Sequence, residues 1–412
     1  MTAPARKPRV LMVAFACNPA GNGEHWLGWG WAEQAASFCE VTLLTWDRFA
    51  KEIEPRAQAL GIKSVCVGAR EWVNRIGDRS VGGRWFRQLV WHRKAAAIAA
   101  RMHSSQKFEI VHQTTFHTFR IPMLAARWEG CQRVWGPIAG GESCPPGFGP
   151  WLGRLRTLEA SRGFMNRAAL ARPSVRRSLR VANSIFVSNH TTLNFFPEWC
   201  RERCMIVSPN AVRDDLPPAR VRKPDAGGPL KLLFVGNCVA TRSIPLVLEA
   251  LGRRRDWPWS LTVVGGGAAL ADWKQDAARL NLTEKVTFTG LLPRAEVARH
   301  YAEADAFVFP ALRDSGGSGV LEAMSSGLPV VCFDWGGPAE MVDAQSGIKV
   351  SVANPEASIT GLAAAFERLR AEPAWRSSLG QAAARRAREE FSWHKKRELL
   401  EATYADCLGG RR

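Results

Sequence analysis

Residues 307–340 read FVFPALRDSGGSGVLEAMSSGLPVVCFDWGGPAE and combine a short apolar run, a glycine-rich turn and a helical pattern. The run that ends at Pro310 predicts a buried strand, and the residues after Gly319 predict a helix. A helix that starts after glycines offers unpaired backbone N–H groups and a positive dipole end to an anion such as a diphosphate. Asp314 and Glu322 bracket this start, and their carboxylates would accept hydrogen bonds from sugar hydroxyls. The stretch therefore predicts a site for a sugar attached to two phosphates.

Short apolar runs recur on both sides of this segment, each followed by glycine, proline or a polar loop. Such runs suit strands that are buried on both faces, as in a parallel sheet covered by helices. The N-terminal half predicts strands at 10–15, 41–44, 109–112, 133–135, 184–187 and 204–207, and a helix at 26–37. The C-terminal half predicts strands at 231–236, 261–267, 286–290, 306–310 and 329–333. The pattern predicts an α/β protein with two Rossmann-like, doubly wound domains that face one another across a cleft.

The chain has 412 residues, which is too long for one ordinary hydrophobic core. A polar stretch rich in proline and glycine at 213–229 predicts the domain linker. We therefore expect an N-terminal domain at 1–212, a C-terminal domain at 230–390, and a final helix at 391–412 that packs back on the first domain.

Two basic segments carry much of the formal charge of +18. Residues 70–101 hold eight basic and two acidic residues, and residues 154–180 hold eight basic and one acidic. Aromatic and aliphatic residues interrupt both, which is typical of helices on an anionic membrane surface; solvated basic faces are the alternative. No nucleic-acid-reading motif occurs, so we expect no nucleic-acid partner.

The ten cysteines are scattered without paired CxxC units, so neither a metal site nor a disulfide framework is expected. No apolar stretch approaches the length of a membrane span, and the N-terminal apolar run predicts a strand rather than a signal peptide. These features predict a cytoplasmic protein, either free or peripheral on the inner face of the membrane.

The segment quoted first resembles the retaining GT-B glycosyltransferases of family 4, whose signature is two acidic residues separated by seven. Asp314 and Glu322 match this spacing, and the later GLPV at 327–330 and GGPAE at 336–340 match as well. The resemblance implies that Glu322 binds the ribose of the donor nucleotide and that Asp314 contacts the donor sugar. The family more often has glutamate at the first of the two positions.

A second match is LFVGNCVATRSI at 233–244, which resembles the family's strand and loop that carry an arginine and a lysine toward the donor diphosphate. Arg242 takes the place of the lysine, and Asn237 takes the place of the arginine. The resemblance implies that stabilisation of the leaving phosphate depends mainly on Arg242 and the helix start.

The N-terminal half contains CNPAGNGEHWLGWGW at 17–31, VHQTTFH at 111–117 and VWGPIAGGE at 134–142, which resemble a branch found in bacterial surface-polysaccharide assembly. Gly21 and Gly23 would allow close approach to the donor or acceptor, and the loop at 140–142 would border the acceptor. Many family members place a histidine near that loop, for which His112 and His117 are candidates here.

The implied catalytic residues are Asp314, Glu322, Arg242 and His117. The implied donor-binding residues are Gly21, Gly23, Gly236, Asn237, Arg242, Ser315, Gly316, Gly317, Ser318, Leu321 and Glu322. No metal ligand is assigned. A dinucleotide site at 265–267 is disfavoured because the sixth-position glycine of that motif is missing.

The resemblance implies a hexosyltransferase-like enzyme that uses a UDP- or GDP-linked sugar as donor, requires no further cofactor or metal, and retains the anomeric configuration. Its acceptor would be a hydroxyl of a glycan or of a lipid-linked acceptor. A nucleotide-sugar epimerase on the same scaffold and a non-catalytic sugar-nucleotide-binding subunit remain the alternatives.

Overall fold

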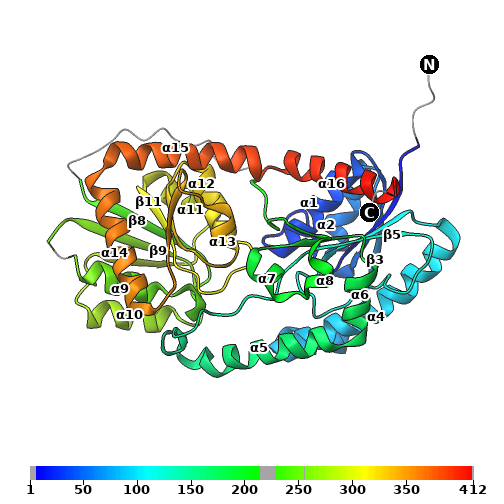
Figure 1. The fold of residues 1–412 in the computed structure, drawn as a ribbon, viewed down its shortest axis with the longest axis horizontal. Coiled ribbons are helices and arrows are strands. Elements are labelled where there is room, and N and C mark those ends of the chain that lie inside the picture. The colour runs from blue at the N-terminus through cyan, green and yellow to red at the C-terminus, as the bar shows by residue number, and fades with distance from the viewer. Residues whose placement is uncertain (1–5, 214–227, 255, 411–412) are drawn as a thin grey trace, which may run out of the picture.

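The computed structural model describes residues 6–213, 228–254 and 256–410. These residues form two parallel sheets covered by helices, which confirms the predicted α/β architecture of two doubly wound units (Figure 1). The predicted linker at 213–229 lies almost wholly outside the described residues.

The first sheet has the strand order β3-β2-β1-β4-β5-β6-β7, and every neighbouring pair is parallel. Its strands are β1 (Arg9–Ala14), β2 (Glu40–Trp46), β3 (Lys63–Val67), β4 (Ile110–Thr115), β5 (Gln132–Ile138), β6 (Ser184–Val187) and β7 (Cys204–Ile206). The helices around it are α1 (Glu24–Ala36), α2 (Ala50–Ala59), α3 (Glu71–Arg79), α4 (Val81–Gln106), α5 (Arg156–Ala171), α6 (Pro173–Val181), α7 (His190–Phe195) and α8 (Glu198–Arg201).

The second sheet has the order β10-β9-β8-β11-β12-β13 and is also parallel. Its strands are β8 (Leu230–Val235), β9 (Trp259–Val264), β10 (Val286–Gly290), β11 (Ala306–Phe309), β12 (Val330–Phe333) and β13 (Gly347–Val350). The helices that follow its strands are α9 (Ile244–Gly252), α10 (Leu270–Arg279), α11 (Arg294–Glu303), α12 (Ser318–Ser325), α13 (Gly336–Met341), α14 (Pro355–Ala371) and α15 (Pro373–Glu390).

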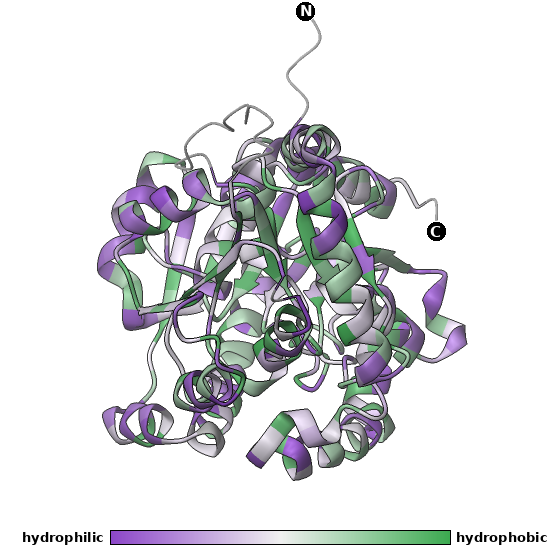
Figure 2. Ribbon diagram, turned by 90° about the vertical axis from the view of Figure 1, so that its left-hand side faces the viewer, coloured by the Kyte–Doolittle hydropathy of each residue, from purple (hydrophilic) through white to green (hydrophobic). Residues whose placement is uncertain are grey.

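The central strands are buried on both faces, as their continuous apolar sequences require. Every residue of β11 and β12 is buried, and so is every residue of β4. In Figure 2 the strands at the centre of the molecule are mostly green, whereas purple segments lie mostly on the outer helices. Burial of apolar surface is therefore the main stabilising contribution in each unit.

The last helix, α16 (Trp393–Leu408), lies on the first unit although it follows the second in the sequence. Helices α15 and α16 run along the top of Figure 1 from one unit to the other. The Trp393 ring occupies the space above Gly30 of α1, where a Cβ atom would overlap the ring. The Lys396 ammonium donates a hydrogen bond to the Ser208 carbonyl oxygen at 2.6 Å, and burial lowers the pKa of Lys396 to about 7.

The buried pair His112 and Tyr404 joins α16 to the centre of the first sheet. The His112 Nε2 atom lies 2.7 Å from the Gly136 carbonyl oxygen, and Nδ1 lies 2.8 Å from the Tyr404 hydroxyl. Because a carbonyl oxygen only accepts hydrogen bonds, Nε2 carries the proton and Nδ1 accepts from Tyr404. Burial lowers the pKa of His112 to about 4, so the ring is neutral at neutral pH.

No helix among the described residues combines the length and the apolar character that crossing a membrane requires.

The lowered pKa of His112 predicts a loss of stability in acid. Between pH 6.5 and about 4 the unfolded chain binds a proton at this histidine and the folded chain does not, so the free energy of unfolding falls as the pH falls. The full effect is on the order of 3 kcal/mol. Urea titrations of the wild type and of His112→Gln at pH 7, 5.5 and 4.5 should show their difference in stability shrinking toward acid. His394→Gln, at an exposed histidine of α16, should follow the wild type, and a constant difference for His112→Gln would contradict the assignment.

Candidate functional site

The loop between β11 and α12 is shaped by the Asp314 carboxylate. Gly317 has a left-handed backbone with φ of 56°, and α12 begins directly after it. The Asp314 Oδ1 atom accepts hydrogen bonds from the N–H groups of Gly316 and Gly317, both at 2.7 Å. The sequence predicted that the amides of this loop are free for an anion, but in this arrangement a carboxylate of the chain already occupies two of them.

Arg242 meets the same carboxylate from the other side. It ends the short 3-10 helix η3 (Ala240–Arg242) and forms an ion pair with Asp314 Oδ2. Its NH1 group donates to the Arg313 carbonyl oxygen at 2.9 Å, and its guanidinium carbon lies 4.9 Å from the centre of the Phe309 ring. Both charged side chains are largely buried, with exposed fractions of 17% and 11%. Residues 72 positions apart thus form one charged unit beside the loop.

Glu322 is held by a buried tyrosine. The Tyr301 hydroxyl on α11 donates to Glu322 Oε2 at 3.1 Å. Burial, and next the negative charge of Glu322, raise the pKa of Tyr301 well above its usual value. The tyrosine therefore stays protonated and acts as a fixed donor that orients the carboxylate.

A cavity of about 140 Å³ lies between the two units and brings several of the predicted donor residues together. It is lined by Asn22, Gly23, Trp26, Asn210, Ala211, Val212, Arg213, Ser318, Leu321 and Glu322. The Asn210 side-chain amide donates to the Gly316 carbonyl oxygen, so the segment after β7 is fastened to the loop before α12. The predicted residues Gly23, Ser318, Leu321 and Glu322 therefore share one interdomain space.

Other predicted residues lie around this cavity rather than in its lining. Asp314 and the residues at 315–317 form the adjoining loop, and Arg242 of η3 pairs with Asp314. The Gly21 carbonyl accepts a hydrogen bond from Arg213 at 3.4 Å. Asn237 is exposed after β8, and Gly236 continues the sheet by donating its N–H to the Val264 carbonyl oxygen at 3.0 Å.

His117 and His112 have different surroundings. The His117 backbone N–H donates to Glu24 Oε1 at 3.0 Å, and Glu24 directly follows Gly23 of the cavity. The His117 Nε2 atom is buried without a hydrogen-bond partner among the described residues, and burial lowers the pKa of the ring. His112 lies in the core with both ring nitrogens in hydrogen bonds, which gives it a structural role.

Besides the Asn210–Gly316 contact, three further polar contacts join the two units. The Arg313 guanidinium forms a two-pronged ion pair with Glu159 of α5, at 2.8 and 3.0 Å. Glu340 of α13 accepts from the His190 backbone N–H at 2.8 Å and from its Nδ1 at 2.9 Å. The Trp335 indole N–H donates to the Ser143 carbonyl oxygen at 2.9 Å.

The loop at 140–142 is fixed by the carboxylate of Glu142. Its Oε2 atom accepts from the Gly140 N–H at 2.8 Å, and its Oε1 atom accepts from the Asn189 amide at 2.7 Å. Asn189 in turn caps α7 through the Thr192 N–H. Glu142 is buried and therefore positions the loop rather than facing an open space.

Sequence reasoning did not identify Tyr301, Asn210, Glu24 or Glu159 as parts of this region. Each acts through a partner distant in the sequence or through a backbone group. A tyrosine or asparagine in an otherwise ordinary helix or loop carries no local signal of such a contact.

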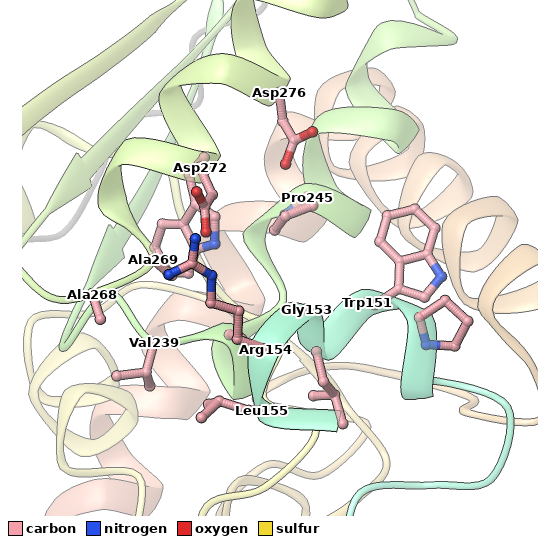
Figure 3. Close-up of a pocket in the computed structure, with 14 residues that line it drawn as sticks. Trp151, Gly153, Arg154, Leu155, Val239, Pro245, Ala268, Ala269, Asp272 and Asp276 are labelled. Atoms are coloured by element: carbon pink, nitrogen blue, oxygen red, sulfur yellow. The ribbon is translucent and has the colours of Figure 1, made fainter. Parts of the chain in front are cut away.

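A second interdomain cavity, of about 360 Å³, lies between the 3-10 helix η2 (Gly149–Leu155) and helices α9 and α10. Figure 3 shows the Arg154 side chain extending toward Asp272, with Trp151 on the opposite side. Val239 and Ala240 in its lining place it beside η3, but none of the predicted donor residues lines it. Within the described ranges, no group of three or more histidine, cysteine or acidic side chains is arranged to hold a metal ion.

Comparison with known proteins finds a family model that matches part of the chain. Residues 218–386 match the family model of glycosyl transferases group 1. The chain is 29% identical over 198 residues to a glycogen synthase of Mycobacterium tuberculosis, covering 47% of each chain. It is 30% identical over 262 residues to a GDP-mannose-dependent alpha-(1-6)-phosphatidylinositol monomannoside mannosyltransferase of Mycolicibacterium smegmatis, covering 59% of this chain and 66% of that protein. The chain spans about half the length of the first of these curated relatives.

Solved structures share the whole architecture. The lipopolysaccharide outer core galactosyltransferase WaaB has a TM-score of 0.66 at 12% identity, covering 98% of this chain and 100% of that chain. HepE of Anabaena, in complex with UDP and glucose, has a TM-score of 0.63 at 12% identity, covering 97% and 100%. The chain has the GT-B fold, and its C-terminal half matches glycosyl transferases group 1.

Proposed function

We propose that this protein transfers a hexosyl group from a nucleoside diphosphate sugar to a hydroxyl of a glycan or lipid-linked acceptor. The observation that carries the proposal is the position of Glu322, which is held by buried Tyr301 and faces an interdomain cavity together with Gly23 and Ser318. A carboxylate fixed in this way suits the paired hydroxyls of a ribose. The group 1 match over residues 218–386 supports the same assignment.

The negative charge that develops on the leaving diphosphate is the main demand of such a reaction. Arg242 and the amides before α12 now pair with the Asp314 carboxylate next to the cavity, and we propose that the diphosphate takes over these positive groups when the donor binds. We assign Glu322 to the donor ribose, Asp314 to the donor sugar and the loop, and Arg242 to the diphosphate. Transfer with retention of configuration and without a metal belongs to the same proposal.

His117 is proposed to contact the reacting sugar. Its lowered pKa keeps the ring neutral at neutral pH, and its buried Nε2 atom has a hydrogen-bonding position without a partner among the described residues. A neutral imidazole in this state serves as a hydrogen-bonding group toward a sugar hydroxyl rather than as a positive charge.

The cavity at Glu322 is small for this task. Its 140 Å³ is below the roughly 300–1,000 Å³ of pockets that hold molecules of this size. We therefore infer that donor binding moves the two units apart and enlarges this cavity. The proposed units are 1–212, 230–390 and the returning helix at 391–412.

One relative is named as GDP-mannose-dependent and one structural neighbour contains UDP, so the proposal includes both nucleotides. A place in surface-polysaccharide synthesis is part of the proposal. A position on the inner face of an anionic membrane agrees with the exposed Trp72, Phe86, Leu158 and Phe164 of the two basic segments. The comparisons favour neither an epimerase nor a non-catalytic subunit.

Substitution of Glu322 or Arg242 should remove most donor binding or turnover without unfolding the protein. Glu322→Gln removes a charged hydrogen-bond acceptor, which we expect to weaken binding of the matching nucleoside diphosphate by about 10-fold or more. Arg242→Ala should mainly lower turnover because it acts on the leaving group. Thermal shifts with UDP and GDP, and nucleotide release from UDP- and GDP-hexoses, measure both effects. Glu296→Gln, exposed on α11, is the matched control, and wild-type behaviour of both site variants would refute the assignment.

Incubation of the protein with donor alone separates transfer from epimerisation. A transferase should release nucleotide only through slow hydrolysis and should leave the remaining sugar unchanged. NMR spectra of the sugar that showed conversion to an epimer without nucleotide release would instead establish the epimerase. Donor binding with neither release nor transfer across an acceptor panel would establish the binding subunit.

The two roles of Asp314 can be separated by substitution. Asp314→Asn retains an oxygen that accepts from Gly316 and Gly317 but loses the charge that pairs with Arg242, whereas Asp314→Ala loses both. We expect a loss of about 1 kcal/mol in stability for the asparagine variant and roughly 2–3 kcal/mol for alanine. Urea unfolding tests this order, and equal losses would show that the loop contacts contribute nothing.

A further inference from the structure

A large groove lies between α4 and α5 on the first unit and shares no lining residue with the cavity at Glu322. Its volume is about 830 Å³, and its apolar part includes Leu89 of α4 with Leu158, Phe164 and Met165 of α5. This volume falls within the range of roughly 300–1,000 Å³ that is typical of pockets for small molecules. In Figure 1, α5 runs along the bottom of the view, outside the two sheets.

Helix α5 has an unusual distribution of polarity. The residues that it buries include Glu159 and Asn166, whereas its exposed residues include Leu158, Phe164 and Met165, with exposed fractions of 56%, 74% and 40%. A helix that only covered a sheet would bury its apolar face and expose its polar one. A gathered set of exposed apolar side chains therefore indicates a surface that binds something apolar.

The same groove concentrates positive charge. Its lining contains Arg120, Arg162, Arg172 and Arg313 but only one acidic residue, Glu159, which Arg313 neutralises. The other three donate hydrogen bonds to neutral oxygens: Arg162 to the Glu142 carbonyl at 3.2 Å, Arg120 to the Asn166 amide at 2.9 Å, and Arg172 to the Arg120 carbonyl.

These guanidiniums also perturb one another. Burial, and next the charges of Arg162 and Arg313, lower the pKa of Arg120 to about 10. Burial and the charge of Arg313 lower the pKa of Arg162 as well. Half-buried arginines that repel one another attract a compact anion, and guanidinium groups suit phosphate oxygens by geometry.

The charged end of the groove adjoins the proposed donor site. Arg313 directly precedes Asp314, and its carbonyl oxygen accepts the hydrogen bond from Arg242. On the other side, Arg162 donates to the Glu142 carbonyl and the Asn166 amide donates to the Gly140 carbonyl at 2.6 Å. The groove therefore leads from exposed apolar residues, past the arginines, to the loop at 140–142.

We propose that this groove binds the carrier of the acceptor, a hydrocarbon chain that ends in a phosphate or diphosphate group. The chain lies along Leu89, Leu158 and Phe164, and the anionic group lies against Arg120 and Arg162. The sugar beyond the phosphate then reaches the loop at 140–142 and the donor. This inference rests on the proposed function, because it identifies the class of acceptor for that reaction.

Farnesyl diphosphate, used below the concentration at which it forms micelles, is the probe for this groove. Calorimetry should detect binding, whereas inorganic diphosphate and farnesol, each lacking one half of the probe, should bind at least about 10-fold more weakly. Leu158→Asp and Phe164→Asp should each weaken binding of the probe by about 10-fold, and Arg162→Gln should remove the advantage of farnesyl diphosphate over farnesol. Trp199→Asp, at a half-exposed tryptophan that lies beside Arg180 and away from the groove, is the matched control.

Several outcomes would overturn the proposal. If both aspartate variants bind farnesyl diphosphate as tightly as the wild type, the groove is not the binding site. If farnesol binds as tightly as farnesyl diphosphate, the arginines do not form an anionic subsite. Failure of the monomeric probe, together with binding to vesicles that contain phosphatidylglycerol, would assign the apolar face to a bilayer instead. Circular dichroism spectra identify any variant that does not fold. If one aspartate variant is unfolded, binding of the probe by the other aspartate variant tests the groove.

The donor site must be tested separately, because farnesyl diphosphate also contains a diphosphate. The groove variants should retain the thermal shift with UDP or GDP, and Glu322→Gln should lose that shift while still binding farnesyl diphosphate. Displacement of farnesyl diphosphate by UDP or GDP would show that the probe binds in the donor site, and this result would overturn the proposal for the groove. If the wild type shows no thermal shift with UDP or GDP but still binds farnesyl diphosphate, the proposed function is refuted and binding in the groove is not.

Discussion

The arrangement of the candidate site depends on the two oxygens of the Asp314 carboxylate. One oxygen accepts from the amides of Gly316 and Gly317 and sets the turn before α12, and the other pairs with Arg242. Because Arg242 in turn donates to the Arg313 carbonyl, the same network fixes the backbone from which Arg313 reaches Glu159 of the other unit. One partly buried carboxylate thus links the shape of a glycine loop, the position of a cation and a contact between the two units. Such a network is stable because every charge in it has a partner.

The returning helix α16 imposes a second constraint. Its Tyr404 contacts His112 in the first sheet and its Lys396 contacts the Ser208 carbonyl, so this helix completes the core of the first unit. The two units are therefore connected twice, once by the chain after β7 and once through α15 and α16. A double connection restricts their relative movement more than a single linker would, and it leaves rotation about the connections as the easiest motion.

The sequence predicted the central strands because they are short, continuous and apolar, as β11 and β12 are. It did not predict β3 or β13, which lie at sheet edges and carry Lys63 and Lys349 among half-buried residues. Glu322 and Gly23 could be assigned to one site because both lie in segments that resemble the family, and both line the interdomain cavity. Tyr301 and Glu159 could not be assigned, because their roles arise only when distant segments pack together. The capping of loop amides by Asp314 was also missed, because the same acidic residue can serve a ligand or its own backbone.

The two basic segments show why charge counts alone are ambiguous. Solvated basic faces, one of the alternatives, would place the interleaved apolar residues inside the fold. Trp91 follows that rule and is fully buried, but Leu158 and Phe164 do not, and α5 instead buries Glu159. Glu159 is buried because it must reach Arg313 across the two units, and this turns the apolar side of the helix outward. The Glu159–Arg313 contact between the two units therefore also exposes the apolar residues that line the groove. The position of α5 relative to the second sheet determines both this contact and the groove.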